Sequence, residues 1–186
     1  MTNKRITLKP LSVDDARLIY DNREYIVSYY NGGISKKEFD NWNYENELES
    51  IKNDIEEIKA GKMASFTIFN ENKEYIGKCM LNKIKKRNEN ASISVSIKER
   101  FWGKGYATEV VQALMKLAFE EYKLHRLEYT YYSINERSKK LAEKLGFKFE
   151  GIKRESKKIG DNFTISYFTV CWPKNTNKIV LTNRVI

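Results

Sequence analysis

The apolar positions of the first sixty residues recur at helical spacing. Leu48, Ile51 and Ile55 follow one another every three or four positions, as on one face of a helix. Further upstream, Ser12 or Asp14 is placed to accept backbone N–H groups at the start of another helix. The elements predicted here are a strand at 6–10, a helix at 12–22, a turn at 31–33 and an interrupted helix at 35–62 that stops at Gly61.

From residue 63 onward the pattern alternates with the period of a β-strand. It is clearest where Ile93, Val95 and Ile97 point to one face and the intervening serines point to the other. Helical spacing returns over 107–118, directly after a pair of glycines. The elements predicted here are strands at 63–70, 75–84, 91–98 and 126–132, helices at 107–118 and 136–146, and a closing hairpin of strands at 147–158 and 163–172.

The order of these elements predicts a fold of the α/β (α+β) class. Successive strands with short turns favour antiparallel pairing, whereas the strand–helix–strand unit at 91–132 needs a crossover and favours a parallel pair. We therefore expect a mixed central sheet of about seven strands with helices on both faces. A chain of 186 residues has room for one sizeable core. Residues 1–173 are expected to form a single domain, and 174–186 a C-terminal tail.

Composition narrows the possible functions only slightly. The net charge is +9, but the lysines are spread along the chain without a nucleic-acid-binding motif, so direct nucleic-acid binding is not expected. Cys79 and Cys171 lie in apolar strands and the chain has one histidine, which disfavours a metal site and favours free thiols in a reducing compartment. Because no stretch resembles a signal peptide or a membrane span, we expect a cytoplasmic protein with no membrane contact.

The glycine turn at 100–108 could follow three phosphate-binding schemes. A mononucleotide P-loop fails, because no glycine lies five residues before Gly103. A dinucleotide fingerprint is a weak match, because its third glycine position holds Thr108. The pattern R/Q-x-x-G-x-G/A matches residues 100–105, which follow a strand and open a helix. In this segment the sequence resembles the GCN5-related N-acetyltransferases (GNAT), in which the same pattern forms the loop for the pyrophosphate of acetyl-CoA.

A second segment supports this resemblance. The stretch "NERSKKLAEKLGF" at 135–147 is similar to the family's N-x-x-S-x-x-x-x-E-K-x-G-F segment, and it also follows a strand. With the "GYATE" that continues the glycine turn, it is closest to the branch of ribosomal-protein alanine N-acetyltransferases, the RimJ/RimL-like enzymes. The resemblance implies the GNAT fold, and acetyl transfer from acetyl-CoA to an amine without a covalent enzyme intermediate.

The resemblance also implies which residues hold acetyl-CoA. Glycines and a helix N-terminus would favour its pyrophosphate. Asn135 would reach the pantetheine arm, cap the following helix, or do both. Many members use a tyrosine as the general acid, but this sequence has Ala142 at that position. In the RimL-like branch the serine of N-x-x-S is a proposed acid, so the resemblance makes Ser138 the candidate; the alternative is that this small residue only leaves space for the thioester. The implied cofactor-binding residues are Val95, Ile97, Arg100, Trp102, Gly103, Lys104, Gly105, Tyr106, Ala107, Asn135 and Ser138.

No general base is assigned from the sequence. Glu99 lies beside the glycine turn and Glu155 on a later strand, and either could be a surface carboxylate. His125, the sole histidine, has a side chain suited to proton transfer, but at the end of a helix it more simply complements the helix terminus. A water relay could replace a side-chain base.

The acceptor amine is expected to bind in the first helical region, which is rich in aromatic residues. Tyr29, Tyr30 and Trp42 are the candidate substrate residues, although some of these rings could instead pack the helices onto the sheet. A protein N-terminal amine is the first hypothesis. A small-molecule amine (polyamine, amino sugar or antibiotic) and a noncatalytic acetyl-CoA-binding regulator are the alternatives. We expect a monomer or a homodimer.

Overall fold

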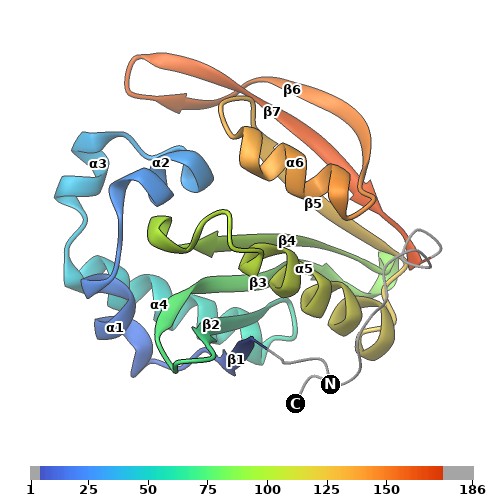
Figure 1. Cartoon of the computed structure of the whole chain (residues 1–186), viewed down its shortest axis with the longest axis horizontal. Coiled ribbons are helices and arrows are strands. Elements are labelled where there is room, and N and C mark those ends of the chain that lie inside the picture. The colour runs from blue at the N-terminus through green and yellow to red at the C-terminus, as the bar shows by residue number, and fades with distance from the viewer. Residues whose placement is uncertain (1–4, 174–186) are drawn as a thin grey trace.

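The computed structural model describes residues 5–173. Its strands are β1 (Ile6–Pro10), β2 (Ala64–Asn70), β3 (Tyr75–Lys85), β4 (Asn90–Ile97), β5 (Arg126–Tyr132), β6 (Lys148–Ile159) and β7 (Asn162–Cys171). They form one sheet in the order β1-β2-β3-β4-β5-β7-β6 (Figure 1). Neighbouring strands are antiparallel except for β4 and β5, which are parallel. The predicted mixed sheet of seven strands with one parallel crossover is confirmed.

The described helices are α1 (Asp15–Asp21), α2 (Tyr25–Gly32), α3 (Lys36–Asn41), α4 (Tyr44–Lys59), α5 (Tyr106–Lys116) and α6 (Glu136–Lys144). The predicted interruption of the second helix lies between α3 and α4. Ser35 and Glu38 form a capping box at the start of α3, and Asn43 and Asn46 form one at the start of α4. Because each box satisfies free N–H groups at a new helix start, the chain forms two helices instead of one.

Two local predictions differ from the structure. The turn expected at 31–33 is instead the end of α2, after which Gly33 adopts a left-handed conformation with φ of +60°. Neither Ser12 nor Asp14 caps α1 with its side chain. The buried carboxylate of Asp15 accepts the backbone N–H of Ser12 at 2.9 Å and pairs with Lys9 at 2.8 Å. The Asp15 carboxylate, and not the side chain of Ser12 or Asp14, therefore stabilises the turn at the start of this helix.

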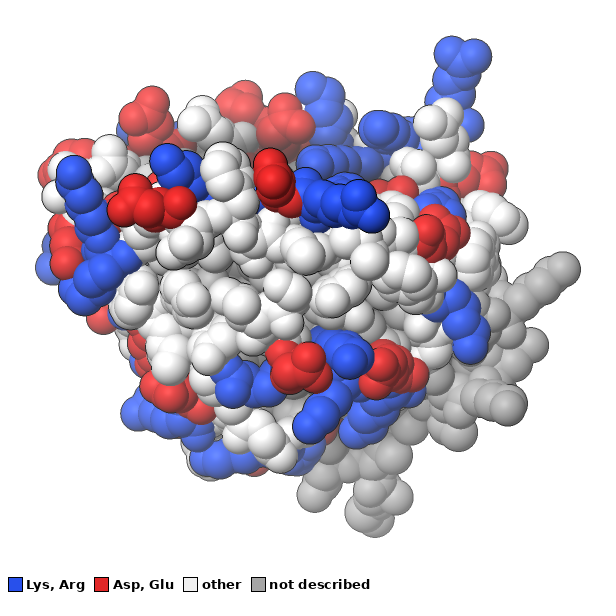
Figure 2. All heavy atoms as spheres, turned by 90° about the horizontal axis from the view of Figure 1, so that it is seen from above, with Lys and Arg blue, Asp and Glu red and all other residues white. Residues whose placement is uncertain are grey.

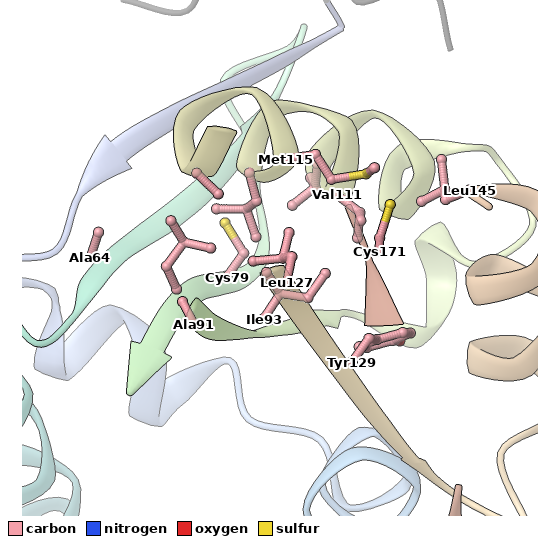
Figure 3. Close-up of a cluster of buried hydrophobic side chains, with 14 of the residues drawn as sticks. Ala64, Cys79, Ala91, Ile93, Val111, Met115, Leu127, Tyr129, Leu145 and Cys171 are labelled. Carbon is pink, nitrogen blue, oxygen red and sulfur yellow. The ribbon is translucent and has the colours of Figure 1, made fainter. Parts of the chain in front are cut away.

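The main core lies between the sheet and α5. Val111 and Met115 of α5 pack with Ile93 of β4 and Leu127 of β5 (Figure 3). This face also buries α6 through Ala142, together with Leu145 directly after the helix. Both cysteines are buried here as free thiols, as expected.

The opposite face of the sheet carries α1 and α4. Because side chains alternate along a strand, Cys79 of β3 points into the α5 core while Lys78 points the other way. There Lys78 pairs with Asp54 of α4 at 2.7 Å. A smaller apolar cluster, which includes Ala16 and Ile51, joins α1 to α4. Helices therefore cover both faces, as predicted.

Candidate active site

The site forms where β4 and β5 separate. The two strands pair only through residues 90–92 and 126–128. Beyond that point β4 continues through Val95 and Ile97 without a paired strand on its β5 side among the described residues, while β5 stays paired with β7 as far as Tyr132. The separation leaves backbone N–H and C=O groups of β4 free to bond an extended ligand.

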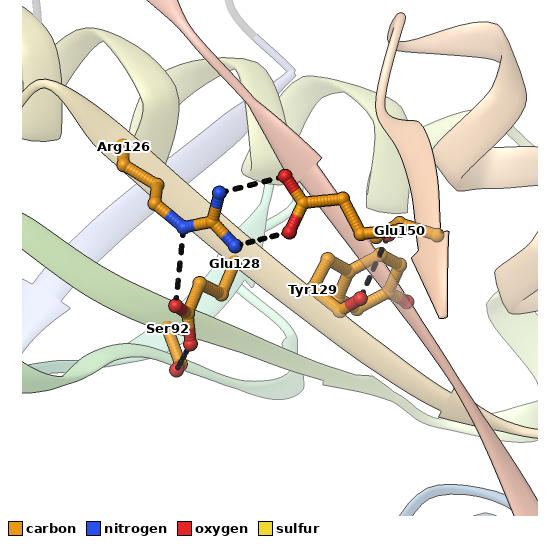
Figure 4. Close-up of polar contacts among 6 residues, drawn as sticks. Ser92, Arg126, Glu128, Tyr129 and Glu150 are labelled. Carbon is orange, nitrogen blue, oxygen red and sulfur yellow. Dashed lines mark hydrogen bonds and ion pairs between the residues drawn. The ribbon is translucent and has the colours of Figure 1, made fainter. Parts of the chain in front are cut away.

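A charged network holds the strands together immediately before they separate. Arg126 donates hydrogen bonds to both carboxylate oxygens of Glu150 on β6, at 2.7 and 2.5 Å, and one to Glu128 at 3.3 Å (Figure 4). Glu128 also accepts a hydrogen bond from Ser92 of β4 at 3.3 Å. Hydrogen bonding and charge from Arg126 lower the pKa of Glu150. The network therefore links β4, β5 and β6 at the last shared rung.

The glycine turn between β4 and α5 has a backbone that favours glycine. Gly103 and Gly105 have φ values of +74° and +88°, in the left-handed region. Because α5 begins at Tyr106, its unbonded N–H groups and positive end lie at the turn. The indole N–H of Trp102 donates to the carbonyl of Ile97 at 2.7 Å, tying the turn to the end of β4. A helix start suited to an anion therefore lies beside the free edge of β4.

Arg5, just ahead of β1, contacts one side of this turn. Its guanidinium pairs with Glu109 of α5 and donates to the carbonyl of Lys104 at 3.1 Å. A Cβ added at Gly105 would lie 3.1 Å from the Arg5 Nη2 atom, whereas a Cβ added at Gly103 would meet nothing within 4 Å. Gly105 therefore leaves room for Arg5, and Gly103 lies on the open side of the turn.

A cleft of about 300 Å³ runs along the turn, β4 and α6. Two predicted cofactor-binding residues do not line it. Arg100 pairs with Glu74 instead, and the ammonium of Lys104 lies 5.4 Å from the ring centroid of Phe101. The predicted residues that line the cleft are Val95, Ile97, Trp102, Gly103, Gly105, Tyr106, Ala107, Asn135 and Ser138.

Helix α6 adds three cations that the sequence analysis did not single out. Arg137, Lys140 and Lys144 all line the cleft, at spacings that place them on one side of a helix. The Cζ atom of Arg137 lies 3.8 Å from the ring centroid of Trp102 and 4.6 Å from that of Tyr30. Their helical spacing could have identified them in the sequence, but the family motif at 135–147 points to Asn135 and Ser138 instead. Together the three cations make the α6 wall of the cleft suitable for an anionic ligand.

A second cavity, of about 330 Å³, lies between the sheet and the helices α1 and α2. Ser94 and Ser96 of β4 line this cavity, whereas Ile97 lines only the cleft. The two spaces meet at a junction whose walls come from α2, β4, β5 and α6. The residues that line both are Tyr30, Asn31, Val95, Tyr129, Asn135 and Ser138.

Ser138 lies at this junction beside the buried Tyr129. Burial raises the pKa of the Tyr129 phenol, and hydrogen bonding with Ser138 opposes that rise. The phenol therefore stays protonated near neutral pH and keeps its hydrogen for bonding. Ala142 is 1% exposed, belongs to the core and lines neither space. The α6 side chain at the junction is thus a serine, not the tyrosine that many family members have one turn later.

The three predicted substrate residues have different surroundings. Tyr30 lines both the cleft and the second cavity. Tyr29 lines neither and faces a separate hollow between α2 and the tip of the β6–β7 hairpin. Trp42 is 39% exposed, and its indole N–H donates to Glu47 at 2.9 Å. Glu47 does line the second cavity, so Trp42 affects that cavity through the hydrogen bond that orients the Glu47 carboxylate.

Asn135 fastens α2 to α6. Its side-chain oxygen accepts the backbone N–H of Ser138 at 3.1 Å and caps α6. Its amide group donates to the Tyr30 carbonyl at 3.0 Å and to the Asn31 side-chain oxygen at 3.1 Å. The capping role considered from the sequence is therefore present. Both amide hydrogens are used to position α2 over the junction.

None of the base candidates weighed from the sequence lines either space. Glu99 and Glu155 are exposed. His125 is also exposed and lies just before β5, at the end of the strand away from the junction. The carboxylates that line the second cavity are Glu24 and Glu47. No motif marks either of them, because the packing of α2 and α4 against the sheet brings them there.

Charge on the described surface is mixed. Figure 2 shows side chains of both signs interspersed around an uncharged central area on the face seen from above. Exposed Phe149, Ile152 and Phe163 of the β6–β7 hairpin add apolar surface to the molecule. Within residues 5–173, no helix is long and apolar enough to cross a membrane, and no group of three or more His, Cys, Asp or Glu residues could hold a metal ion.

Comparison with known proteins places these features in a family. The acetyltransferase (GNAT) domain profile matches residues 5–148. An uncharacterized N-acetyltransferase, p20, of Bacillus licheniformis is 30% identical over 158 residues, covering 83% of this chain and 85% of that protein. The probable N-acetyltransferase YjcK of Bacillus subtilis (strain 168) is 30% identical over 165 residues, covering 86% of this chain and 89% of that protein.

Solved structures share the fold. Spermidine N-acetyltransferase from Vibrio cholerae, in complex with CoA and spermine, has a TM-score of 0.79 and 22% identity over 93% of this chain and 98% of that one. RimL, a ribosomal L7/L12 α-N-protein acetyltransferase in complex with CoA, has a TM-score of 0.80 and 17% identity over 92% and 96%. Because both types match equally well, assignment to the RimJ/RimL-like branch stays a prediction. The chain belongs to the GNAT family and is an acetyl-CoA-dependent N-acetyltransferase.

Proposed function

We propose that this enzyme transfers the acetyl group directly to a primary amine at the junction of the cleft and the second cavity. The observation that carries this proposal is that the two spaces share Val95, Tyr129 and Ser138 as walls. A donor in one space and an acceptor in the other would meet there without a covalent enzyme intermediate. We call the second space the acceptor cavity.

The cleft has the features that acetyl-CoA requires. The free edge of β4 at Val95 and Ile97 can pair with the amides of the pantetheine arm. The turn at Gly103 has open space, and the start of α5 favours pyrophosphate. Arg137 adds a cation that pairs with no carboxylate among residues 5–173. When bound, acetyl-CoA supplies an acetyl group activated as a thioester.

Ser138 would act as the general acid. Its hydroxyl lies at the junction, where it can donate a proton to the departing sulfur while Tyr129 holds it in position. Val95 and the ring of Tyr30 also line the junction and add apolar surface beside the thioester. The nitrogen loses one proton as its bond to the acetyl carbon forms and the C–S bond breaks, and that proton, passed through water, restores the Ser138 hydroxyl. The proposal uses no metal ion and assigns no side-chain base.

The acceptor proposed first is a protein N-terminal amine. The motif at 135–147 favours it, because its serine and glutamate match the RimJ/RimL-like pattern. A polyamine is the second candidate, favoured by Glu24 and Glu47 in the acceptor cavity. The proposal also places the enzyme in the cytoplasm, since Cys79 and Cys171 are buried free thiols. A monomer or a homodimer would suffice, because both spaces are lined by one chain.

Two measurements test the proposal. Thermal unfolding with acetyl-CoA at about a hundred times its dissociation constant should show stabilisation of roughly 2.7 kcal/mol. A thiol-release assay should then detect CoA formation with N-terminal peptides or with small amines. Turnover with small amines alone would reject the protein N-terminus, and acetyl-CoA binding without turnover on any amine would reject an enzymatic role in favour of a regulator.

A further inference from the structure

Two carboxylates in the acceptor cavity have no cationic partner. Glu24, at the start of α2, uses one oxygen to accept the backbone N–H of Glu99 at 2.7 Å. Glu47, on α4, uses one oxygen to accept the indole N–H of Trp42 at 2.9 Å. In the part of the chain that the structure describes, neither forms an ion pair with a lysine or arginine, and each has a second oxygen with no hydrogen bond. Two negative charges therefore remain available in this cavity.

The cations that line the same cavity are held by other groups. Lys78 pairs with Asp54, and both side chains are largely buried. Lys98 donates to the side-chain oxygen of Asn22 at 2.6 Å. Arg23 donates to the carbonyl of Tyr20 at 2.9 Å and stacks on its ring, with 3.8 Å from Cζ to the centroid. In the described chain no ion pair joins these cations to Glu24 or Glu47. Arg23 and Lys98 bond to neutral oxygens and so keep their charge, and the Nε atom of Arg23 is buried without a hydrogen-bond partner.

The pKa of Tyr75 responds to the negative charge at this end of the cavity. Burial raises the pKa of its phenol most, and the negative charges of Glu47, Asp15 and Glu24 raise it further. Both cavity carboxylates thus act on the same hydroxyl, although one comes from α2 and the other from α4. Tyr75 precedes Gly77, the strand partner of Ile97, so this end of the cavity lies where β4 ends, and a positive charge would be stabilised there.

This end lies away from the reacting centre. Glu24 is fixed to the backbone at Glu99, just past the end of β4, whereas the junction lies at Val95. At about 3.3 Å for each strand residue, this separation is on the order of 10 Å. Glu24 is thus too far from the thioester to bind the amine that is acetylated, and both carboxylates can face the remainder of the acceptor.

We infer that Glu24 and Glu47 select acceptors that carry a second positive charge on the order of 10 Å from the reacting amine. The inference rests on the proposed use of this cavity for the acceptor. It applies to a long-chain diamine or polyamine and equally to a peptide with a basic side chain near its N-terminus. In both cases the second cation would bond to the free oxygens, which charge-assisted hydrogen bonds make favourable.

The test compares acceptors of similar length that differ in one charge. Octamethylenediamine and octylamine form one pair, and alanyl-alanyl-lysine amide and alanyl-alanyl-glutamine amide form another. The wild-type enzyme should show a kcat/KM at least about tenfold higher for the dicationic member of a pair, as expected for a hydrogen bond between charged groups. Equal kcat/KM values for both members of each pair would overturn the inference.

Substitutions localise the effect. Glu24→Gln and Glu47→Gln keep an oxygen for the N–H of Glu99 and of Trp42, so the cavity should keep its shape. Each should lower kcat/KM for the dicationic acceptor about tenfold and leave the monocationic acceptor nearly unchanged. Glu45→Gln, on the exposed side of α4, is the matched control and should change neither. A loss of the same size for both members of a pair would contradict selective recognition of charge.

Equilibrium binding separates this inference from the proposed function. Titration of the CoA-loaded protein with each diamine and monoamine measures recognition without turnover. If no amine is acetylated but octamethylenediamine binds more tightly than octylamine, and Glu24→Gln abolishes that difference, the inference holds while the proposed reaction fails. If amines are acetylated and the two ligands bind with equal affinity, the reaction holds and the inference fails.

Discussion

The cleft and the acceptor cavity are built in opposite ways. The cleft comes mainly from one continuous part of the chain, β4 through α6, and offers backbone groups and the left-handed Gly103 and Gly105. The acceptor cavity is assembled from α1, α2, α4 and the strands β3 to β5, and it offers side chains such as Glu24 and Glu47. Backbone recognition constrains sequence at fixed spacing, so it leaves a motif. Recognition by side chains brought together in space leaves none.

Their charges also differ. Three cations of α6, Arg137, Lys140 and Lys144, line the cleft. The acceptor cavity also has three cations in its walls, but it adds two carboxylates without ion-pair partners in the described chain, Glu24 and Glu47. An anionic donor and a cationic acceptor would each be favoured on one side of the junction.

Gly105→Val should have the largest effect, and only on the cleft side. A β-branched residue at φ of +88° is strained, and its side chain would displace Arg5 from the turn. We expect a loss of about 1–2 kcal/mol in the free energy of unfolding, together with loss of the roughly 2.7 kcal/mol stabilisation by acetyl-CoA. Thermal unfolding with and without acetyl-CoA measures both.

Gly160→Val is the matched control for this substitution. Gly160 also has a left-handed backbone, with φ of +59°, but it lies at the tip of the β6–β7 hairpin and lines neither the cleft nor the acceptor cavity. It should lose stability while keeping the response to acetyl-CoA. An unchanged acetyl-CoA response in Gly105→Val would show that the turn does not hold the cofactor.

Ser138→Ala should affect the junction alone. Loss of a general acid lowers kcat by about a hundredfold or more, while the KM for acetyl-CoA should stay nearly constant because the backbone contacts of the cleft remain. Steady-state thiol release measures both constants. Ser50→Ala, on helix α4 and outside both spaces, should behave like the wild type. A normal kcat in Ser138→Ala would remove the serine from the acid role.

The sequence predicted the sheet better than the helices that cover one face. Alternation such as that of Ile93, Val95 and Ile97 identifies a strand wherever it pairs, since one side of the strand is always buried. Helix α2 was missed, because Tyr25–Gly32 contains aromatic and apolar residues without a helical stripe and buries none of them fully. Its position depends on Asn135, more than a hundred residues away.

Contacts between residues far apart in the sequence also limited what could be predicted about the site. The glycine turn and the segment at 135–147 could be recognised because their geometry is local. Trp42 was selected for its ring, yet its contact is a hydrogen bond to Glu47, and it is the carboxylate that lines the cavity. Arg100 was selected by the motif, yet Glu74 from the β2–β3 turn pairs with it. Contacts with residues from distant segments therefore decide which of the residues in a sequence motif line the site.

Asn135→Ala should weaken the tether between the two sides. It removes the cap of α6 and the two bonds to α2, at an expected cost of about 2 kcal/mol in unfolding free energy. Asn135→Ser restores a capping hydroxyl without the reach to α2 and should recover about 1 kcal/mol. Urea unfolding gives both values. If the two variants are equally stable, the cap contributes little and the bonds to Tyr30 and Asn31 account for the loss.

Glu150→Gln should have the smallest effect. It changes the charged network at the last residues where β4 and β5 pair, and it changes no residue that lines the cleft or the acceptor cavity. Arg126 lowers the pKa of Glu150, so the pair adds stability above the ordinary carboxyl pKa of about 4.3 and loses it as pH falls through the lower folded value. The side chains are 24% and 32% exposed, which limits the contribution to about 0.5–1 kcal/mol. Urea unfolding should therefore separate wild type from Glu150→Gln near neutral pH, and the difference should shrink in acid.

Glu155→Gln, an exposed change on the same strand, should match the wild type at both pH values. A difference that persists in acid would mean that Glu150 acts through packing, and that charge does not hold the strands together where they separate.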